Sequence, residues 1–275
     1  NTARNGLTGS PAGTTTAALA VLGSQSGTLV SNVESWNGSA WTEVSEANSN
    51  RQDHGGSGTS TANLIFGGNT GSVSALTESW DGSSWTEVSD MNEKRMLGSG
   101  FGISTSFIAA GSDPGGDSPY AKTESWDGTS WTEVSDLNTN TTDPMGDGAT
   151  NTAAIRAGGA VPPAQAVTEI WNGSSWTEVA DLGTARYQGG SGGITTAFLV
   201  FGGDPPYTGK TELWNGSSWS EVADLSVARR QLEGTGTSTS AIAFGGQSAS
   251  GTANLVASVE EWTSPTSTTN QITEE

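Results

Sequence analysis

The sequence predicts an all-β fold, a closed ring of six units with four antiparallel strands each, and three observations lead to it. An eleven-residue motif that opens on Glu-x-Trp recurs along the whole chain, and a short apolar run ending in glycine separates successive copies. A stretch rich in Gly, Ser and Thr precedes each apolar run. Four short strands in about 45 residues, repeated six times, are typical of a β-propeller.

The Glu-x-Trp motif is the strongest repeat. It reads ESWNGSAWTEV at 34–44 and returns at 78–88, 124–134, 169–179 and 212–222, with a degraded copy, EEWTSPTSTTN, at 260–270. The leading tryptophans are Trp36, Trp80, Trp126, Trp171, Trp214 and Trp262, at spacings of 44, 46, 45, 43 and 48 residues. The second ones are Trp41, Trp85, Trp131, Trp176 and Trp219, so the motif contains all 11 tryptophans.

Each part of the unit predicts one strand. Small residues suit an innermost strand against a crowded central channel, and the apolar run suits a second strand buried on both faces. The third and fourth strands form a hairpin turned by Asn-Gly or Asp-Gly, dipeptides that tolerate a positive φ. Alternation places Glu34, Trp36, Trp41 and Glu43 on one face of that hairpin, and we expect the tryptophans to pack between blades.

The units predict a single domain with blades at approximately 1–48, 49–92, 93–138, 139–183, 184–226 and 227–275. An open solenoid is the alternative, but solenoids need distinct caps and the first unit starts in full register with the later ones. The last unit lacks the second tryptophan, so the sequence does not define the outer strand of blade six. Because the chain begins at Asn1, we expect a processed product or a piece of something longer.

The Gly-Gly doublet, the aromatic residue and the following tryptophan resemble the kelch repeat, whose family fold is a β-propeller. The resemblance covers essentially the whole chain, although Trp replaces the usual tyrosine and the turn is shorter than in most kelch blades. The near-identical copies of WNGSSWTEV also resemble repeats of kelch-like proteins in marine bacteriophages. This resemblance implies a fibre or appendage protein of a virion.

The charge balance excludes several kinds of partner. With 10 Lys and Arg against 29 Asp and Glu the net charge is −19, which repels nucleic acid and anionic membrane surfaces. No apolar run approaches the ~20 residues that cross a bilayer, so we expect no membrane insertion. The absence of cysteine excludes disulfides and thiolate metal sites.

Two charged positions recur with the repeat. The glutamates before the first tryptophans are Glu34, Glu78, Glu124, Glu169, Glu212 and Glu260. Arginines open most units, namely Arg4, Arg51, Arg95, Arg186 and Arg229, with Thr141 at that place in unit four. A ring of carboxylates could bind cations, but a structural Glu–Arg pair in every blade is favoured, because a catalytic site needs asymmetry.

Enzymatic signatures are weak, and we expect no catalytic residue, no cofactor and no metal. The SWDGSSWT stretch at 79–86 resembles the Asp-box of sialidases, which is structural in that family, and the tyrosines and arginines form no sialidase constellation. Copper chemistry of the galactose-oxidase type needs two histidines and a Tyr–Cys crosslink, whereas His54 is the one histidine and is expected in a loop or first strand. The pairs Asp113/Asp117 and Asp143/Asp147 could hold Ca²⁺, but solvated turn acids are favoured.

Length varies mainly in the loop that joins strands two and three. These loops emerge on one face of a propeller, and a constant scaffold under variable loops indicates a recognition surface. The candidate ligand-binding residues there are Asp113, Asp117, Tyr120, Asp204 and Tyr207. Unconstrained drift of the loops is the alternative.

These observations predict a non-enzymatic structural or adhesive module in a phage fibre, a capsid appendage or a bacterial surface, located on the virion or outside the cell. It would contact a host glycan or neighbouring proteins, as part of a larger assembly or homo-oligomer. The alternative is an extracellular propeller hydrolase or lyase acting on polysaccharide. Loop acids and a tyrosine converging in one pocket would favour the enzyme.

Overall fold

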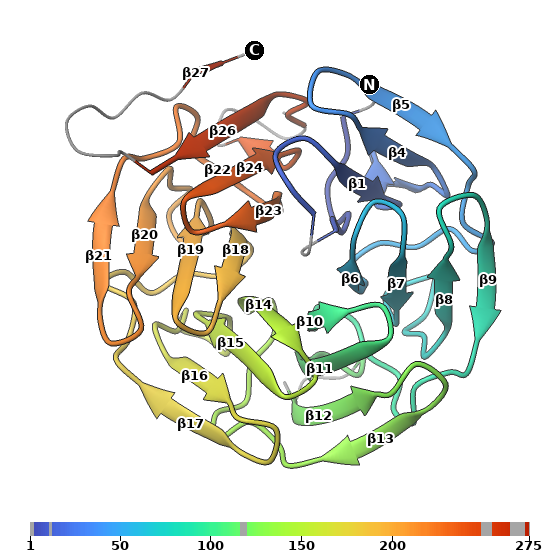
Figure 1. Ribbon diagram of the computed structural model, residues 1–275, viewed down its shortest axis with the longest axis horizontal. Coiled ribbons are helices and arrows are strands. Elements are labelled where there is room, and N and C mark those ends of the chain that lie inside the picture. The colour runs from blue at the N-terminus through green and yellow to red at the C-terminus, as the bar shows by residue number, and fades with distance from the viewer. Residues whose placement is uncertain (1–2, 11–12, 116–119, 249–254, 265–272, 275) are drawn as a thin grey trace.

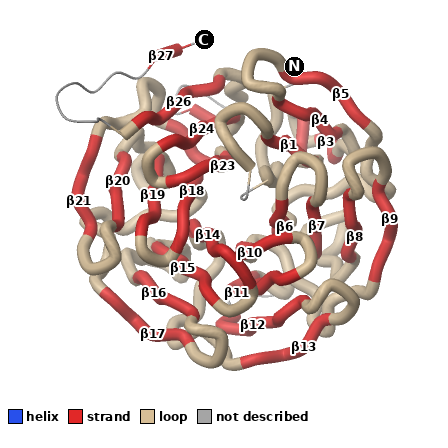
Figure 2. Tube along the Cα trace, in the orientation of Figure 1, coloured by secondary structure: helices blue, strands red, loops and turns tan. Residues whose placement is uncertain are grey.

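The computed structural model describes residues 3–10, 13–115, 120–248, 255–264 and 273–274. Within these residues all regular structure is β-strand, and Figure 2 contains no helix. Six antiparallel sheets stand around a central axis, so the chain is the six-bladed β-propeller that the repeat predicts (Figure 1). The described part of the chain accordingly has no helix able to span a bilayer.

In each blade the strands follow one another from the axis to the rim (Figure 1). Blades two to six each contain four strands. Blade two has β6 (Gly55–Gly58), β7 (Asn63–Phe66), β8 (Thr77–Trp80) and β9 (Trp85–Val88). Blade three has β10 (Ser99–Ile103), β11 (Ser106–Ser112), β12 (Tyr120–Trp126) and β13 (Trp131–Val134), and blade four has β14 (Met145–Thr150), β15 (Ala153–Ala157), β16 (Thr168–Trp171) and β17 (Trp176–Val179). Blade five has β18 (Gly190–Ile194), β19 (Ala197–Phe201), β20 (Thr211–Trp214) and β21 (Trp219–Val222), and blade six has β23 (Glu233–Thr237), β24 (Ser240–Phe244), β26 (Val259–Thr263) and β27 (Thr273–Glu274).

Blade one consists of β1 (Ala18–Val21), β4 (Val33–Trp36) and β5 (Trp41–Val44) plus an innermost segment that pairs at one position. The Thr8 and Val21 backbones exchange two hydrogen bonds, of 3.1 and 2.8 Å. Two short ribbons complete the fold, β2 (Ser24–Gln25) with β3 (Thr28–Leu29) and β22 (Arg229–Arg230) with β25 (Gln247–Ser248).

The small residues of the innermost strands are required by their neighbours as well as by the axis. A Cβ added at Gly55 would overlap the Phe66 ring of its own blade, and one at Gly146 would overlap Phe101 of the preceding blade. The second strands are buried over most of their length, as in β7, which contains Phe66, and β19, which contains Phe198 and Phe201. Crowding at the channel, the reason predicted from the sequence, is therefore joined by aromatic packing within and between blades.

The tryptophans pack between blades. Trp80 and Trp85 of blade two join one buried cluster with Leu19 and Val21 of blade one, and the pattern repeats around the ring. The two indoles of one hairpin are cross-strand partners, with centroids 5.3 Å apart for Trp80 and Trp85. The leading indole of every blade donates to a carbonyl in the turn after the innermost strand, as Trp80 does to Ser60 at 3.0 Å.

The Asn-Gly and Asp-Gly hairpins differ from the expected geometry. Only the glycine of the pair has a positive φ, +95° at Gly82. The acid contributes through its side chain, because Asp81 Oδ1 accepts from the backbone N–H of Ser83 and Ser84, each at 2.8 Å. A hydrogen bond from Ser83 Oγ and those backbone bonds lower the pKa of Asp81 to about 2. The result is a four-residue loop closed by the acid.

A buried Arg–Glu pair lies in every blade. Arg51 contacts Glu78, and its Nη1 also donates to the carbonyls of Gly67 and Leu76 at 3.0 and 2.8 Å. The other carboxylate oxygen of Glu78 accepts the Asn48 backbone N–H at 2.7 Å, which fixes the linker from the preceding blade. The remaining pairs are Arg4–Glu34, Arg95–Glu124, Arg156–Glu169, Arg186–Glu212 and Arg229–Glu260.

In blade four the arginine of the Arg–Glu pair comes from the second strand and not from the linker before the blade. Thr141 stands where the other units have arginine, and Arg156 on β15 reaches Glu169 instead. Both side chains are fully buried. Because an unpaired carboxylate is costly to bury, the ion pair survives the loss of its usual cation by recruiting one from the adjacent strand.

The ring closes through the same contacts that join its other blades. A backbone N–H after each second strand donates to the carbonyl at the arginine position of the next unit, as Gly68 does to Arg95 at 2.8 Å. At the closing seam Gly246 donates to Arg4 at 3.4 Å, and the Trp41 ring lies 5.1 Å from Phe244. No sheet of the described residues contains strands from both blade one and blade six.

Candidate functional site

One face of the ring carries the linkers between blades and the loops between second and third strands, such as 67–76 and 158–167. We call it the loop face. At its centre lie six equivalent residues with a left-handed backbone, each two positions after the arginine position. They are Gly6, Asp53, Leu97, Asp143, Gln188 and Gln231, with φ between +48° and +59°.

Five backbone hydrogen bonds link these six residues in series around the axis. From Asp53 onward, each N–H donates to the carbonyl of the preceding residue in the series: Asp53 to Gly6 at 2.9 Å, Leu97 to Asp53 at 2.8 Å and Asp143 to Leu97 at 2.7 Å. Gln188 and Gln231 continue the series at 3.3 and 2.7 Å. The left-handed conformation turns each linker toward the axis, so the side chains of the five non-glycine residues surround one hollow.

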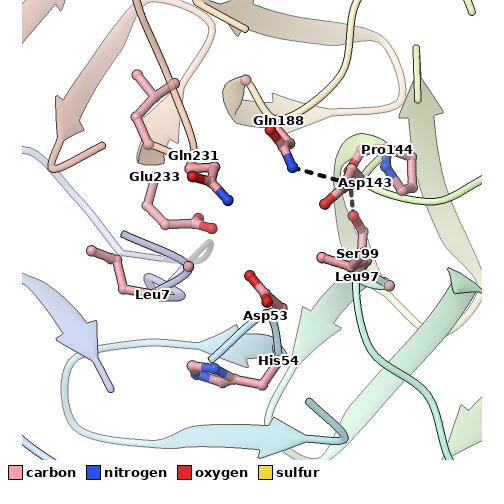
Figure 3. Close-up of a pocket in the computed structure, with 14 residues that line it drawn as sticks. Leu7, Asp53, His54, Leu97, Ser99, Asp143, Pro144, Gln188, Gln231 and Glu233 are labelled. Carbon is pink, nitrogen blue, oxygen red and sulfur yellow. Dashed lines mark hydrogen bonds between the residues drawn. The ribbon is translucent and has the colours of Figure 1, made fainter. Parts of the chain in front are cut away.

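That hollow is the axial pocket, a cavity of about 90 Å³ lined by the ring and by His54, Ser99, Pro144 and Glu233, among others (Figure 3). Asp53, Gln188 and Gln231 extend toward its open centre from different blades (Figure 3). Gln188 Nε2 donates to Asp143 Oδ2 at 3.3 Å. Gly6 is the one member of the six without a side chain. A Cβ at this position would lie 2.7 Å from Asp53 Oδ1, which is too close for a normal contact.

The acids of the pocket hold their protons unusually tightly. Burial, with a contribution from the Asp53 charge, raises the pKa of Asp143 to about 8. Burial also raises the pKa of Glu233 to about 8, and that of Asp53 above its usual range. The pocket therefore presents both neutral carboxyl groups, which donate and accept hydrogen bonds, and amides, which do the same.

His54 lies beside the pocket and is 5% exposed. Neither ring nitrogen has a hydrogen-bond partner. Burial and the nearby Arg51 and Arg4 charges hold the pKa of His54 well below its usual range, so the imidazole is neutral. It occupies the linker immediately before β6, in agreement with the loop position expected from the sequence.

A second polar group lies on the loop face at the junction of blades five and six. Arg230 Nη1 contacts Asp204 Oδ2 at 3.0 Å, and its guanidinium stands 4.9 Å from the Tyr207 ring centroid. The Tyr207 hydroxyl donates to Gln247 Oε1 at 3.1 Å. The six other arginines of the sequence lie in the buried Arg–Glu pairs, so Arg230 is the arginine that remains for the surface.

The candidate residues from the sequence do not all meet. Asp204 and Tyr207 lie together beside Arg230. Asp113 occupies the place of Asp204 two blades away, where its backbone pairs with Met96 and its Oδ1 accepts the Gly115 N–H at 2.7 Å. Asp117 and the side chain of Tyr120 lie outside the described residues.

Two acids of the sequence analysis are not the solvated turn acids it favoured. Asp143 belongs to the axial pocket, whereas Asp147 lies within β14 and is 3% exposed. Asp147 accepts backbone N–H bonds from Gly148 and Gly193, and burial raises its pKa to about 8. Among the described residues no group of three or more acids and histidine is arranged to hold a metal ion.

The ring geometry has a parallel among solved structures. A structure described as "Structure of YjhT" matches this chain with a TM-score of 0.80, covering 99% of this chain and 97% of that one. The two chains share this fold. At 13% sequence identity, the likeness to YjhT shows the propeller architecture alone. No family model matches the chain, and no curated protein sequence matches it.

Most residues of the axial pocket were not among the candidates predicted from the sequence. Asp53, Gln188, Gln231 and Glu233 lie in linkers and innermost strands, outside the loops whose length varies. A signal was present, because the residue two places after the arginine position changes from unit to unit while the arginine position barely does. Aligning the linkers as closely as the tryptophan motif would have exposed it.

Proposed function

We propose that the chain is a non-enzymatic binding module whose loop face takes a hydroxyl-rich ligand such as a host-surface glycan. It would act in a phage fibre, a capsid appendage or a bacterial surface structure, beside neighbouring subunits. One observation carries the proposal: the six left-handed residues around the axis read Gly, Asp, Leu, Asp, Gln and Gln, whereas the tryptophan motif of the same chain barely changes.

Left-handed backbone makes this variation informative. A non-glycine residue in this conformation costs roughly 1–2 kcal/mol, and glycine would satisfy the same backbone without it. Gly6 demonstrates that glycine fits the ring. Residues held at such positions concentrate at functional sites, because the surrounding fold supports a side chain that is needed there. We therefore assign the five side chains a role in contacting a ligand.

The chemistry of the pocket suits a neutral polyhydroxyl ligand. The amides of Gln188 and Gln231 and the protonated carboxyl groups of Asp143 and Glu233 donate and accept hydrogen bonds in several directions, and the Asp53 carboxyl group accepts them. The net charge of −19 disfavours a polyanionic ligand. Tyr207 adds an aromatic face farther out, and such faces pack against apolar ring surfaces.

A second candidate, a hydrolase or lyase acting on polysaccharide, is favoured by the same acids. A carboxyl group with a pKa of about 8, as at Asp143 and Glu233, is protonated at neutral pH and suits a general acid. Strongly shifted acids in a pocket are a recognised sign of catalysis. Tyrosine, which we named as a discriminating residue for an enzyme, does not line this pocket among the described residues.

One experiment separates the two candidates. The full chain is applied to an array of neutral and acidic glycans, and each glycan bound is then incubated with the chain and analysed for cleavage. Binding without cleavage, lost in Gln231→Ala and Asp53→Asn, is the expected result. Ile194→Ala is the matched control, because Ile194 is exposed at the opposite mouth of the channel.

Cleavage abolished by Asp143→Asn would replace the proposal with the enzyme. Binding that survives both pocket substitutions but fails in Tyr207→Ala would move the site to the rim. Absence of binding to every glycan, with a correctly folded chain, would contradict the proposal.

A further inference from the structure

Each blade carries one backbone bridge beside the axial pocket. The bridge joins the residue that follows the arginine position to a residue just past the second strand, and we call these two residues a bridge pair. The first residue of every pair directly precedes one of the six left-handed residues around the axis. The pairs are Asn5–Ser24, Gln52–Asn69, Met96–Asp113, Thr142–Ala160, Tyr187–Asp204 and Arg230–Gln247.

The bridge pairs of blades five and six are joined by their side chains. Asp204 Oδ2 accepts from Arg230 Nη1 at 3.0 Å and from the Tyr187 hydroxyl at 3.5 Å. Gln247 Oε1 accepts from the Tyr207 hydroxyl at 3.1 Å, and the Arg230 guanidinium lies against the Tyr207 ring. We call these five residues the shelf. The other four bridge pairs contain neither an aromatic residue nor an arginine, so this side of the loop face differs from the rest.

The shelf keeps hydrogen-bonding groups that its own contacts do not use. The Arg230 side chain is 30% exposed and that of Asp204 is 13% exposed. In the described part of the chain nothing donates to Asp204 Oδ1. Arg230 Nη2 is 3.5 Å from Gln247 Oε1, which is long for a hydrogen bond. An acceptor and a donor are therefore left for a ligand, beside the half-buried ring of Tyr207.

The axial pocket leads to the shelf. The pocket and an adjoining cavity of about 70 Å³ have room for no more than one sugar. Linkers of all six blades enclose the pocket, so a longer glycan enters with one end and continues over the loop face. Gln188 and Gln231, which extend toward the centre of the pocket, directly follow Tyr187 and Arg230 in the chain (Figure 3). The shelf is thus the surface next to the two amides.

We propose that the shelf binds the second sugar of a neutral glycan whose terminal sugar occupies the axial pocket, an inference that rests on the proposed function. One hydroxyl of the second sugar donates to Asp204 Oδ1, and a neighbouring hydroxyl accepts from Arg230 Nη2. The apolar face of this sugar packs against Tyr207, whose ring is held by its contacts with Arg230 and Gln247. The chain thus binds the ends of oligosaccharides in preference to single sugars.

The charges of the shelf favour a neutral second sugar. Arg230 is paired with Asp204, so the two charges cancel and do not attract an acidic sugar. A carboxylate placed there would compete with Asp204 for the guanidinium and would be repelled by the net charge of −19.

Titration calorimetry of the full chain with matched sugars tests the proposal. The probes are glucose, galactose, mannose and N-acetylglucosamine, each as the monosaccharide, as the disaccharide of two such sugars, and as a disaccharide with glucuronic acid in the second place. In a series that binds, the neutral disaccharide should bind at least about tenfold more tightly than the monosaccharide, because the second sugar adds an aromatic contact and charge-assisted hydrogen bonds. The disaccharide with glucuronic acid should bind more weakly than the neutral one.

Substitutions in the shelf should remove only the gain from the second sugar. Tyr207→Ala and Arg230→Met should reduce the affinity for the disaccharide to about that for the monosaccharide, whose own affinity should not change. Tyr207→Phe keeps the ring and loses the hydroxyl, so it should retain most of the gain. The matched control is Met96→Ala, at the position of Arg230 in blade three, which should change neither affinity. Unchanged binding of the monosaccharide also shows that each variant is folded.

Equal affinity for the monosaccharide and the neutral disaccharide would overturn the proposal and leave the proposed function standing. A gain that survives both Tyr207→Ala and Arg230→Met would place the second sugar elsewhere and would also overturn it. Tighter binding of the disaccharide with glucuronic acid would contradict the neutral second sugar. If none of the sugars binds to the folded chain, the proposed function fails and this inference fails with it.

Discussion

The second tryptophan of blade two, Trp85, lacks a hydrogen bond that its counterparts in blades three to five have. Its Nε1 is buried without a partner, and the residue is 7% exposed. In the next blades the equivalent Nε1 donates to a threonine of the preceding blade, as Trp131 does to Thr77 at 3.2 Å. Blade one has Val33 at the threonine position, fully buried. We predict that Val33→Thr stabilises the protein.

The magnitude follows from the groups exchanged. A new buried hydrogen bond contributes about 1 kcal/mol, and the unsatisfied donor it relieves costs about 1–3 kcal/mol. Exchanging a buried methyl for a hydroxyl loses about 1 kcal/mol of apolar transfer energy. The new hydroxyl proton has an acceptor, because the Ser31 carbonyl corresponds to the Ala75 carbonyl that Thr77 contacts. The net gain is about 1–3 kcal/mol.

Equilibrium unfolding in urea measures the effect for Val33→Thr and for the reverse substitution, Thr77→Val. The first should raise the free energy of unfolding. The second should lower it by a similar amount, because Trp131 Nε1 would lose its acceptor, Thr77 Oγ1. In a Trp85→Phe background the gain from Val33→Thr should vanish, because phenylalanine has no donor. A gain that persists in that background, or a loss in both, would refute the reasoning.

Three further changes test other features. Leu97→Gly should raise the free energy of unfolding by about 1 kcal/mol, since it relieves left-handed backbone at φ +58°, and a loss seen in urea melts would contradict the assigned strain. Arg156→Val should cost about 3–5 kcal/mol by leaving Glu169 buried and unpaired, and adding Thr141→Arg should recover most of it. A double variant no more stable than the single one would show that the linker position cannot replace the strand position. Burial raises the pKa of Asp143 from 3.8 to about 8, so the stability its proton confers is full below about pH 4 and is lost as pH rises toward 8. The melting temperature of Asp143→Asn, relative to that of the natural protein, should therefore be higher at about pH 8 than at about pH 4. If the difference in melting temperature between the two proteins is the same at both pH values, Asp143 does not titrate in this way.

The sequence was most informative where geometry repeats. Trp36 and its five counterparts define the third strands, and the apolar runs define the second, because both depend on local alternation and burial. Asn-Gly signalled the hairpins but not the role of the Asn side chain, since an amide oxygen that accepts two backbone N–H bonds leaves no mark on composition.

Contacts between distant positions were harder to predict. Arg156 lies in an apolar run, and only the register of β15 against β16 places it opposite Glu169. The axial pocket depends on six linkers turning toward one axis, which requires the ring to be closed first. Motif spacing does not encode that convergence, so the variation at Gln188 and Gln231 could be seen in the sequence but not placed at one pocket.

The closing seam has a topological consequence. Blade one and blade six meet through the Gly246–Arg4 hydrogen bond and the Trp41–Phe244 contact, the kind of joint found between other neighbours. The junction between blades one and six is thus equivalent to the other blade junctions. A circularly permuted chain that starts at another blade boundary should therefore form the same ring. Pulling on the two termini would load that joint before any strand is peeled from its sheet.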